Sequence, residues 1–293
     1  MGFSMRLEKL WGNPVTAPCT RLAVQMGKDK AATMLLLRFI RPTCMGRTRE
    51  IFPSVQVLGF VRHSNLVPLW ALYVGPRGEK LLVHPFFLHG SLYHFLKDGE
   101  SKFYKWDTIH KLSVGIAKGI DHLHNALAGP IIHGNLKSKN ILLDVDLVPH
   151  LSDYGLHLLL SSTAAQEMLD VSASEGYKAS ELIKTKDVCR ETDIYSLGII
   201  FLEMLTRKEP TATNLSSSWE LHLPTSVRNL ALQRKLPDIF SPELLSRGKN
   251  QRFSNNAEQQ LLSYFQLAMS CCSPSPSLRP EIKQVLRILD EIS

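Results

Sequence analysis

The spacing of apolar residues predicts a small sheet with one helix in the first part of the chain. Residues 32–40, ATMLLLRFI, form an apolar run of strand length. Residues 65–75 and 80–87 are rich in β-forming residues and are separated by PRGE, which predicts a hairpin. Residues 49–61 instead place apolar residues at helical spacing, and Pro53 fits such a helix only near its first turn.

After residue 92 the pattern becomes helical. Residues 106–125 predict a long helix, and residues 192–206 are apolar enough to predict a buried one. Residues 257–272 and 279–292 predict two more helices. Residues 207–255 are rich in Ser, Pro, Asn and Arg, and predict loops with short helices.

These patterns predict an α+β protein with two lobes. Residues 1–30 mix prolines, glycines and charges without a period, so we expect an irregular N-terminal segment. Residues 31–90 should form a small, β-rich and incomplete N-lobe, and residues 91–293 a large, mainly α-helical C-lobe.

Composition narrows the class of protein. The net charge is +7, but residues 1–50 hold nine Lys/Arg against three Asp/Glu. The basic excess therefore lies in one segment and forms no stripe, which argues against nucleic-acid binding. The five scattered cysteines contain no CxxC pair, which favours a reducing compartment over a disulfide framework or a zinc site. No apolar run reaches the ~20 residues of a membrane span.

Short motifs in a fixed order resemble those of protein kinases. They are HSNLVPL (63–69), KLLVHPFFLHGSL (80–92), IIHGNLKSKNILLD (131–144), LSDYGL (151–156), GYKASEL (176–182), TDIYSLGIIFLEMLT (192–206) and SPSLRP (275–280). Each fragment alone is weakly specific, whereas the ordered set, covering roughly residues 32–292, is very specific. The sequences of these motifs are similar to those of plant leucine-rich-repeat receptor-like kinases, especially their transmembrane kinase-like pseudokinase branch.

The resemblance implies residues that would meet Mg²⁺ and the transferred phosphate. Asp153 and Asn140 match the two residues that hold the metal ions, and Lys137 matches the loop lysine near the phosphate. A buried Asp and Asn can equally just tie loops together.

The resemblance also implies a nucleotide pocket. His84 matches the residue that guards the adenine site, Phe87 belongs to the hinge, and Leu142 would close the pocket from below. Arg38 or Leu37, depending on alignment, takes the place of the lysine that contacts the nucleotide phosphates, and Arg38 would still offer positive charge.

Several parts of the kinase pattern are missing. The H-R-D loop reads His133-Gly134-Asn135, so an Asn, which accepts no proton near neutral pH, stands where the general base belongs. Losing a positioned base typically costs ~10²–10⁴ in rate. Gly134 removes the Arg that would pair with a phosphorylated activation loop. Ser54, nine residues before His63, replaces the Glu partner of the missing lysine.

The glycine-rich phosphate loop is missing as well. Only Gly12 lies in KLWGNPVTAPCTRLA, where a phosphate-binding loop needs several glycines. The codons of Gly12–Leu22, read two nucleotides out of frame, permit Lys-Ser-Gly-Tyr-Gly-Thr-Leu-Tyr-Lys-Ala. We therefore hypothesise that residues around 12–21 are a frameshifted glycine-rich loop. A transcript that encodes residues 12–21 as given, in an unbroken reading frame, would rule out a sequencing error as the cause.

Framework motifs of the family are kept. Asp193 matches the helix residue that holds the catalytic-loop backbone, and Glu181 and Arg279 match an ion pair that anchors the segment after the activation loop. The resemblance also implies a column of buried side chains that joins the lobes, formed by Leu58, Leu69, Tyr154 and His133. Residues 161–176 carry several hydroxyls that a partner kinase could phosphorylate, or form a plain mobile loop.

These observations favour an inactive or very weakly active receptor-like kinase domain that binds signalling proteins or other receptor-like kinases. Binding of ATP with Mg²⁺ should be weak or absent. The alternative is an active Ser/Thr protein kinase, favoured by Asp153, Asn140 and Lys137. A structural helical protein with chance matches is disfavoured by the ordered motifs. The family implies a cytoplasmic domain at the inner face of the plasma membrane, reached through an upstream region or a partner.

Overall fold

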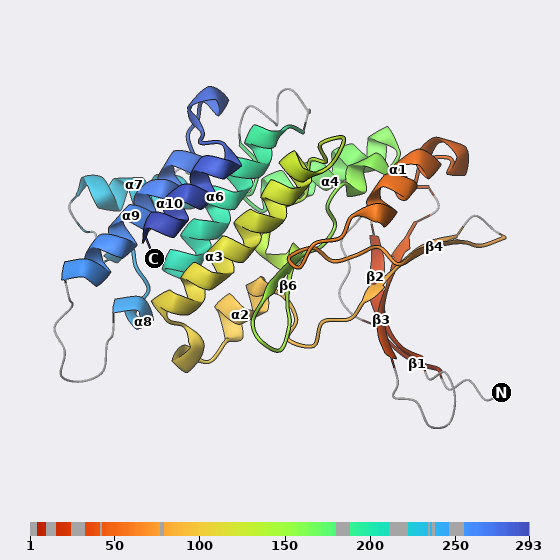
Figure 1. Ribbon diagram of the computed structural model, residues 1–293, viewed down its shortest axis with the longest axis horizontal. Coiled ribbons are helices and arrows are strands. Elements are labelled where there is room, and N and C mark those ends of the chain that lie inside the picture. The colour runs from red at the N-terminus through yellow and green to blue at the C-terminus, as the bar shows by residue number, and fades with distance from the viewer. Residues whose placement is uncertain are drawn as a thin grey trace.

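The structure is a computed structural model with two lobes, a sheet-containing lobe at one end and a helical lobe at the other (Figure 1). It describes residues 5–9, 16–24, 33–41, 43–76, 79–179, 188–210, 222–233, 235, 238–245 and 255–292. The predicted bilobal α+β fold is confirmed.

The N-lobe is built on a five-stranded antiparallel sheet with strand order β1-β2-β3-β5-β4. Its strands are β1 (Met5–Lys9), β2 (Thr16–Val24), β3 (Thr33–Ile40), β4 (Ala71–Val74) and β5 (Lys80–Pro85). The predicted strand and hairpin are confirmed, and β5 inserts between β3 and β4.

The N-terminal segment belongs to this sheet, so the prediction of an irregular segment over 1–30 is wrong where the strands lie. The expectation of an incomplete N-lobe sheet is corrected with it. The prediction failed because β2 is ordered by pairing with the apolar strand β3. The spacing of apolar residues within residues 1–30 does not reveal such a partner. Residues 10–15, where the proposed frameshift begins, lie outside the described residues, and that hypothesis stays a prediction.

Helix α1 (Thr48–Phe60) packs Ile51 and Leu58 toward the core. Pro53 lies in its second turn, one turn deeper than predicted. Proline removes a backbone donor there and leaves a carbonyl unpaired within the helix. Pro53 is exposed, so water can satisfy that carbonyl.

The C-lobe is organised around α6, whose residues 192–206 are all buried. Its helices are α2 (Leu92–Asp98), α3 (Trp106–Asp121), α6 (Arg190–Thr206), α7 (Leu223–Leu232), α8 (Pro242–Leu245), α9 (Asn255–Cys271) and α10 (Ile282–Ile292). A Cβ on Gly198 would lie 2.7 Å from the Cβ of Cys271, so α6 and α9 need a glycine at their contact. The helices predicted from apolar spacing are confirmed.

The loop that the resemblance assigns to catalysis, residues 131–137, leads into a 3₁₀ turn (Ser138–Asn140). Strands β6 (Ile141–Leu143) and β7 (Pro149–Leu151) follow and pair in an antiparallel ribbon. An isolated bridge from Leu66 to Leu151 ties this ribbon to the segment after α1.

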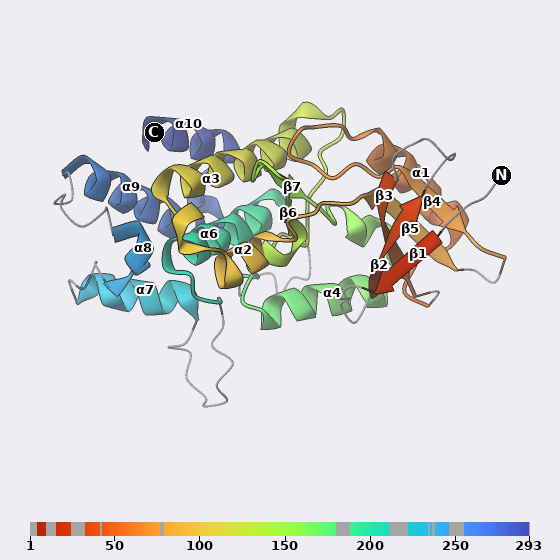
Figure 2. The same ribbon diagram turned by 90° about the horizontal axis from the view of Figure 1, so that it is seen from below.

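Residues 161–176 form a helix where a mobile loop was the alternative expectation. Helix α4 (Ser162–Ser174) begins at Ser161, whose Oγ accepts a hydrogen bond from the backbone N–H of Ala164. Figure 2 shows α4 extending between the sheet and the C-lobe. Its N-terminal end is fixed to the connection between β3 and α1, because Ser161 N–H donates to the carbonyl of Cys44 at 2.8 Å.

Candidate functional site

The catalytic loop is held from the α6 side by Asp193, as the sequence predicts. The Asp193 carboxylate accepts the backbone N–H groups of His133 at 2.7 Å and Gly134 at 2.9 Å. It also lies 2.9 Å from Nε2 of His124. Burial alone would raise the pKa of Asp193, but the hydrogen bond and charge of His124 lower it. A charged, fully buried carboxylate therefore fixes the loop backbone.

The predicted column of side chains between the lobes is buried at all four positions, Leu58, Leu69, Tyr154 and His133. The rings of His133 and Tyr154 meet edge to face, with centroids 6.4 Å apart. Tyr154 also donates its hydroxyl to the carbonyl of Val67 at 2.9 Å. These contacts join the DYG segment to both lobes.

The predicted anchor pair is described only in part. Glu181 lies outside the described residues. Arg279 donates to the carbonyls of Ser273 at 2.9 Å and Glu191 at 3.0 Å, so it ties the start of α6 to the turn before α10.

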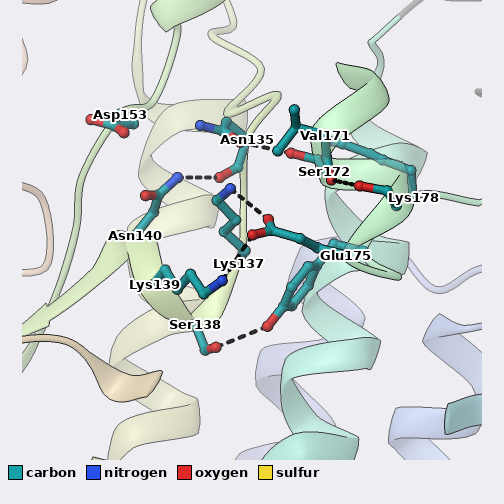
Figure 3. Close-up of polar contacts among 12 residues, drawn as sticks. Asn135, Lys137, Ser138, Lys139, Asn140, Asp153, Val171, Ser172, Glu175 and Lys178 are labelled. Atoms are coloured by element: carbon teal, nitrogen blue, oxygen red, sulfur yellow. Dashed lines mark hydrogen bonds and ion pairs between the residues drawn. The ribbon is translucent and has the colours of Figure 1, made fainter. Parts of the chain in front are cut away.

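Asn135 lies at the place that the sequence comparison assigns to the general base, and it is fully buried. Its side-chain Oδ1 accepts a hydrogen bond from the hydroxyl of Ser172 on α4 at 2.9 Å. Its backbone carbonyl accepts from Nδ2 of Asn140 at 2.8 Å (Figure 3). The amide thus serves as a hydrogen-bonding partner for α4.

Lys137 is bound by the end of the same segment. Its Nζ lies 2.7 Å from Oε2 of Glu175, and Nζ of Lys139 lies 2.9 Å from Oε1 of that carboxylate (Figure 3). Burial would raise the pKa of Glu175, but the charge of Lys137 and the hydrogen bonds of both lysines lower it. The lysine predicted to approach a phosphate is therefore already paired with a carboxylate.

The residues that follow α4 dock on the loop as well. Buried Lys178 donates to the carbonyl of Gly134 at 2.8 Å. Burial, together with the charge of Lys137, lowers the pKa of Lys178 to about 8. The hydroxyl of Tyr177 lies 2.8 Å from Oγ of Ser138 and donates to Glu203 at 2.7 Å.

Gly134 has a backbone that suits glycine. Its φ is +73°, and a Cβ at this position would lie 2.7 Å from Nδ1 of His157. An arginine here would meet both the backbone strain and the His157 ring. Glycine at position 134, where the kinase pattern has arginine, therefore fits both the backbone conformation and the neighbouring His157 ring.

Asp153 is paired with Arg38 across the lobe boundary, Oδ2 to Nη1. Of the two candidates for the lysine place, Leu37 is a buried strand residue and Arg38 faces Asp153. Asn140 lies close to the DYG segment, since its carbonyl accepts from Ser152 N–H at 2.8 Å and Oγ at 3.0 Å.

This arrangement does not fit the predicted Mg²⁺ ion. Mg²⁺ requires oxygen ligands in a near-octahedral shell, and a carboxylate is its main charged ligand in proteins. Of the two predicted ligands, only Asp153 is a carboxylate, and Arg38 already neutralises its charge.

The predicted nucleotide residues lie where the lobes meet. His84 on β5 donates from Nδ1 to the carbonyl of Pro68 at 3.0 Å. Burial, reinforced by the charge of Arg38, lowers the pKa of His84 to about 4. The ring of Phe87 lies 4.5 Å from that of His150, and Leu142 pairs with His150 in the β6–β7 ribbon. His84, Phe87, Leu142 and Arg38 are thus brought to one region.

Sequence reasoning missed the residues that cover the loop, namely Ser172, Glu175 and Lys178. One signal was available, because Ala164, Met168 and Ser172 recur at i, i+4 and i+8 and are all buried on one face of α4. The partners of Ser172 and Glu175 could not be read from spacing, since they lie in the catalytic loop far away in sequence.

The fold and the loop define a protein kinase domain. The family described as "Protein kinase domain" matches residues 37–288, and the chain belongs to this family. Within it, the relatives are plant receptor-like kinases. The kinase-like protein TMKL1 of Arabidopsis thaliana is 35% identical over 260 residues, which cover 88% of this chain and 38% of the relative. Four further Arabidopsis thaliana relatives, 28–32% identical, have names that begin "Probable inactive receptor kinase" or "Putative inactive receptor-like protein kinase".

Solved structures agree with this family. The maize SIRK1 kinase domain bound to AMP-PNP superposes with a TM-score of 0.82 at 25% identity, covering 98% of this chain and 93% of that one. The pseudokinase domain of BIR2, described as an immune regulator of the RLK/Pelle family, gives a TM-score of 0.77 at 25% identity, covering 97% and 80%. The chain spans less than half the length of the curated relatives it matches. Among the described helices, none has the length and apolar character needed to cross a bilayer.

Proposed function

We propose that this domain is a receptor-like kinase domain that transfers phosphoryl groups very weakly or not at all and acts as a protein-binding signalling module. The observation that carries the proposal is Asn135, which stands at the position of the general base and hydrogen-bonds to Ser172. An amide cannot take the proton of a substrate hydroxyl, and loss of a base typically lowers the rate by ~10²–10⁴.

The docking of α4 and the residues after it on the loop supports the same proposal. Glu175 binds Lys137, and Lys178 binds the carbonyl of Gly134, so α4 and the residues after it cover the loop that would receive a substrate. Protein substrate would have to break these contacts before reaching the loop. The surface of the domain, rather than its cleft, is then what partners recognise, and the partners we expect are other receptor-like kinases and signalling proteins.

Nucleotide binding is expected to be weak or absent. Arg38 pairs with Asp153, and Ser54 offers α1 no carboxylate for the phosphate-binding cation. A ligand at about a hundred times its dissociation constant adds ~2.7 kcal/mol of stability. Titration with ATP, with and without Mg²⁺ or Mn²⁺, should leave the thermal unfolding midpoint unchanged.

The second candidate function is a Ser/Thr protein kinase, favoured by Asp153, Asn140 and Lys137, which keep the kinase residue types. In that case α4 would open on activation and Lys137 would become free to approach a phosphate.

A phosphoryl-transfer assay separates the two functions. Purified native chain, Lys137→Met and Asn135→Asp are incubated with labelled ATP and Mg²⁺ or Mn²⁺, and label on the chain and on a general protein substrate is counted. We expect all three proteins at background. Transfer by the native chain that Lys137→Met abolishes would overturn the proposal, and a strong gain in Asn135→Asp would favour the kinase.

A further inference from the structure

The ion pair between Arg38 and Asp153 joins the two lobes directly. Arg38 lies on β3 of the N-lobe, and Asp153 lies in the DYG segment, 115 residues later in the chain. The two side chains are only 11% and 4% exposed. A pair this well shielded is little screened by salt, and it holds one strand of the sheet at a fixed place over the DYG segment.

Asp153 needs a positive partner in this position. A carboxylate buried without a countercharge is costly. The histidines that interact electrostatically with Asp153, His84 and His133, are uncharged near neutral pH, because burial lowers the pKa of each to about 4. Arg38 supplies the charge that they do not.

The surroundings of Arg38 also favour an ion pair with Asp153 over an ion pair with a residue of helix α1. Ser54 stands on α1 where the resemblance places a glutamate, so this helix residue brings no negative charge to the guanidinium. Arginine is charged at every accessible pH and is less strongly hydrated than an ammonium group, which suits it to a buried ion pair. Its long side chain reaches from β3 to Asp153 without an intervening group.

We propose that the guanidinium of Arg38 is a built-in cation at Asp153, occupying the place of a metal ion, and that it keeps the lobes joined without metal or nucleotide. The domain then presents one fixed arrangement of its lobes to partners. The inference does not depend on the absence of phosphoryl transfer.

A double-mutant cycle tests the pairing. The native chain, Arg38→Met, Asp153→Asn and the double variant are compared by thermal unfolding without nucleotide. Arg38→Met should lower Tm by roughly 5–15 °C, because it leaves a buried carboxylate unpaired. The double variant should lose clearly less than the sum of the single losses. Arg49→Met, at an exposed position on α1, is the control for loss of charge. Additive losses would overturn the pairing.

A metal titration tests whether Arg38 occupies the place of a metal ion. If the ion pair were only structural, removing Arg38 would not create a response to Mg²⁺. Millimolar MgCl₂ is compared with NaCl at equal ionic strength. The Tm of the native chain should not respond. Arg38→Met should gain a Mg²⁺-dependent rise in Tm that the added Asp153→Asn change removes. An Arg38→Met variant without this rise would overturn the proposal.

The native chain alone keeps the proposal falsifiable if Arg38→Met does not fold. A Mg²⁺-dependent rise in the Tm of the native chain that Asp153→Asn abolishes would show that Asp153 binds the metal despite Arg38, and would overturn the built-in cation. No nucleotide is present in either experiment, so their outcome is separate from that of the phosphoryl-transfer assay.

Discussion

The two sides of the catalytic loop differ in whether their contacts match the kinase pattern. Toward α6, Asp193 binds the backbone N–H groups of His133 and Gly134, as the kinase pattern predicts. Toward the cleft, Asn135 binds Ser172 and Lys137 binds Glu175, neither of which that pattern predicts.

The difference shows that the shape of the loop and its chemistry rest on separate interactions. The loop backbone is fixed by a buried carboxylate behind it, whatever its outward side chains are. Those side chains can therefore contact α4 without disturbing the backbone of the loop. The following predictions test this separation, in order of expected effect.

Asp193→Ala should have the largest effect, lowering the free energy of unfolding by about 3–5 kcal/mol. It removes the acceptor of the two loop N–H groups and the partner of His124, all buried. Urea unfolding measures the loss, with Asp146→Ala, at an exposed turn, as control. Equal stability of the two variants would show that the loop is held elsewhere.

Gly134→Arg should lower the free energy of unfolding by about 2–4 kcal/mol, because it combines a left-handed backbone with a clash at His157. Gly129→Arg is the matched control, since a Cβ there has open space. Adding His157→Ala to Gly134→Arg should recover part of the loss. If both glycine variants are equally stable, the loop tolerates an arginine at position 134.

Acid should destabilise both sides of the loop. Burial lowers the pKa of His133, in the loop, and of His84, on β5, to about 4. The unfolded chain binds these protons near pH 6.5, so the stabilisation is full above that pH and declines as pH falls toward 4. Each histidine should remove roughly 1–2 kcal/mol by pH 5.

Urea unfolding at pH 7 and pH 5 measures this difference. His84→Leu should reduce it, whereas His89→Leu, at an exposed position, should not. A difference that His84→Leu leaves unchanged would assign the acid sensitivity to other groups.

Glu175→Gln should have the smallest effect on global stability, roughly 1 kcal/mol, because the carboxylate is partly exposed and the amide still accepts a hydrogen bond. Locally, amide hydrogen exchange over residues 161–176 should become faster as the end of α4 loosens. Glu167→Gln, exposed on the same helix, is the control. Unchanged exchange would mean that the lysines do not hold α4.

Much of the fold could be predicted from the sequence, because α9 and α10 bury faces that repeat at helical spacing and α6 is apolar along most of its length. The N-terminal strands could not, because β2 is ordered by pairing with β3 and β1 by pairing with β2, and the residues of β2 show no alternation. The position of each kinase-like residue in the catalytic loop could also be predicted from the order of the sequence motifs.

The partners across the cleft were not predictable. Arg38 and Leu37 were equal candidates from alignment, and only the three-dimensional path of β3 turns Arg38 toward Asp153. The contact of Asn135 with Ser172 requires α4 to be folded and docked, which depends on tertiary packing rather than on local pattern.

Helix α4 is fixed at both ends to different parts of the molecule. At its start, Ser161 N–H binds the carbonyl of Cys44 and Gly46 N–H binds that of Leu159, while at its end Glu175 binds Lys137. The β3–α1 connection and the catalytic loop therefore share one element, and their free energies of opening are coupled through it. By thermodynamic reciprocity, a partner that favours the docked helix from one end slows hydrogen exchange at the other end by the same coupling.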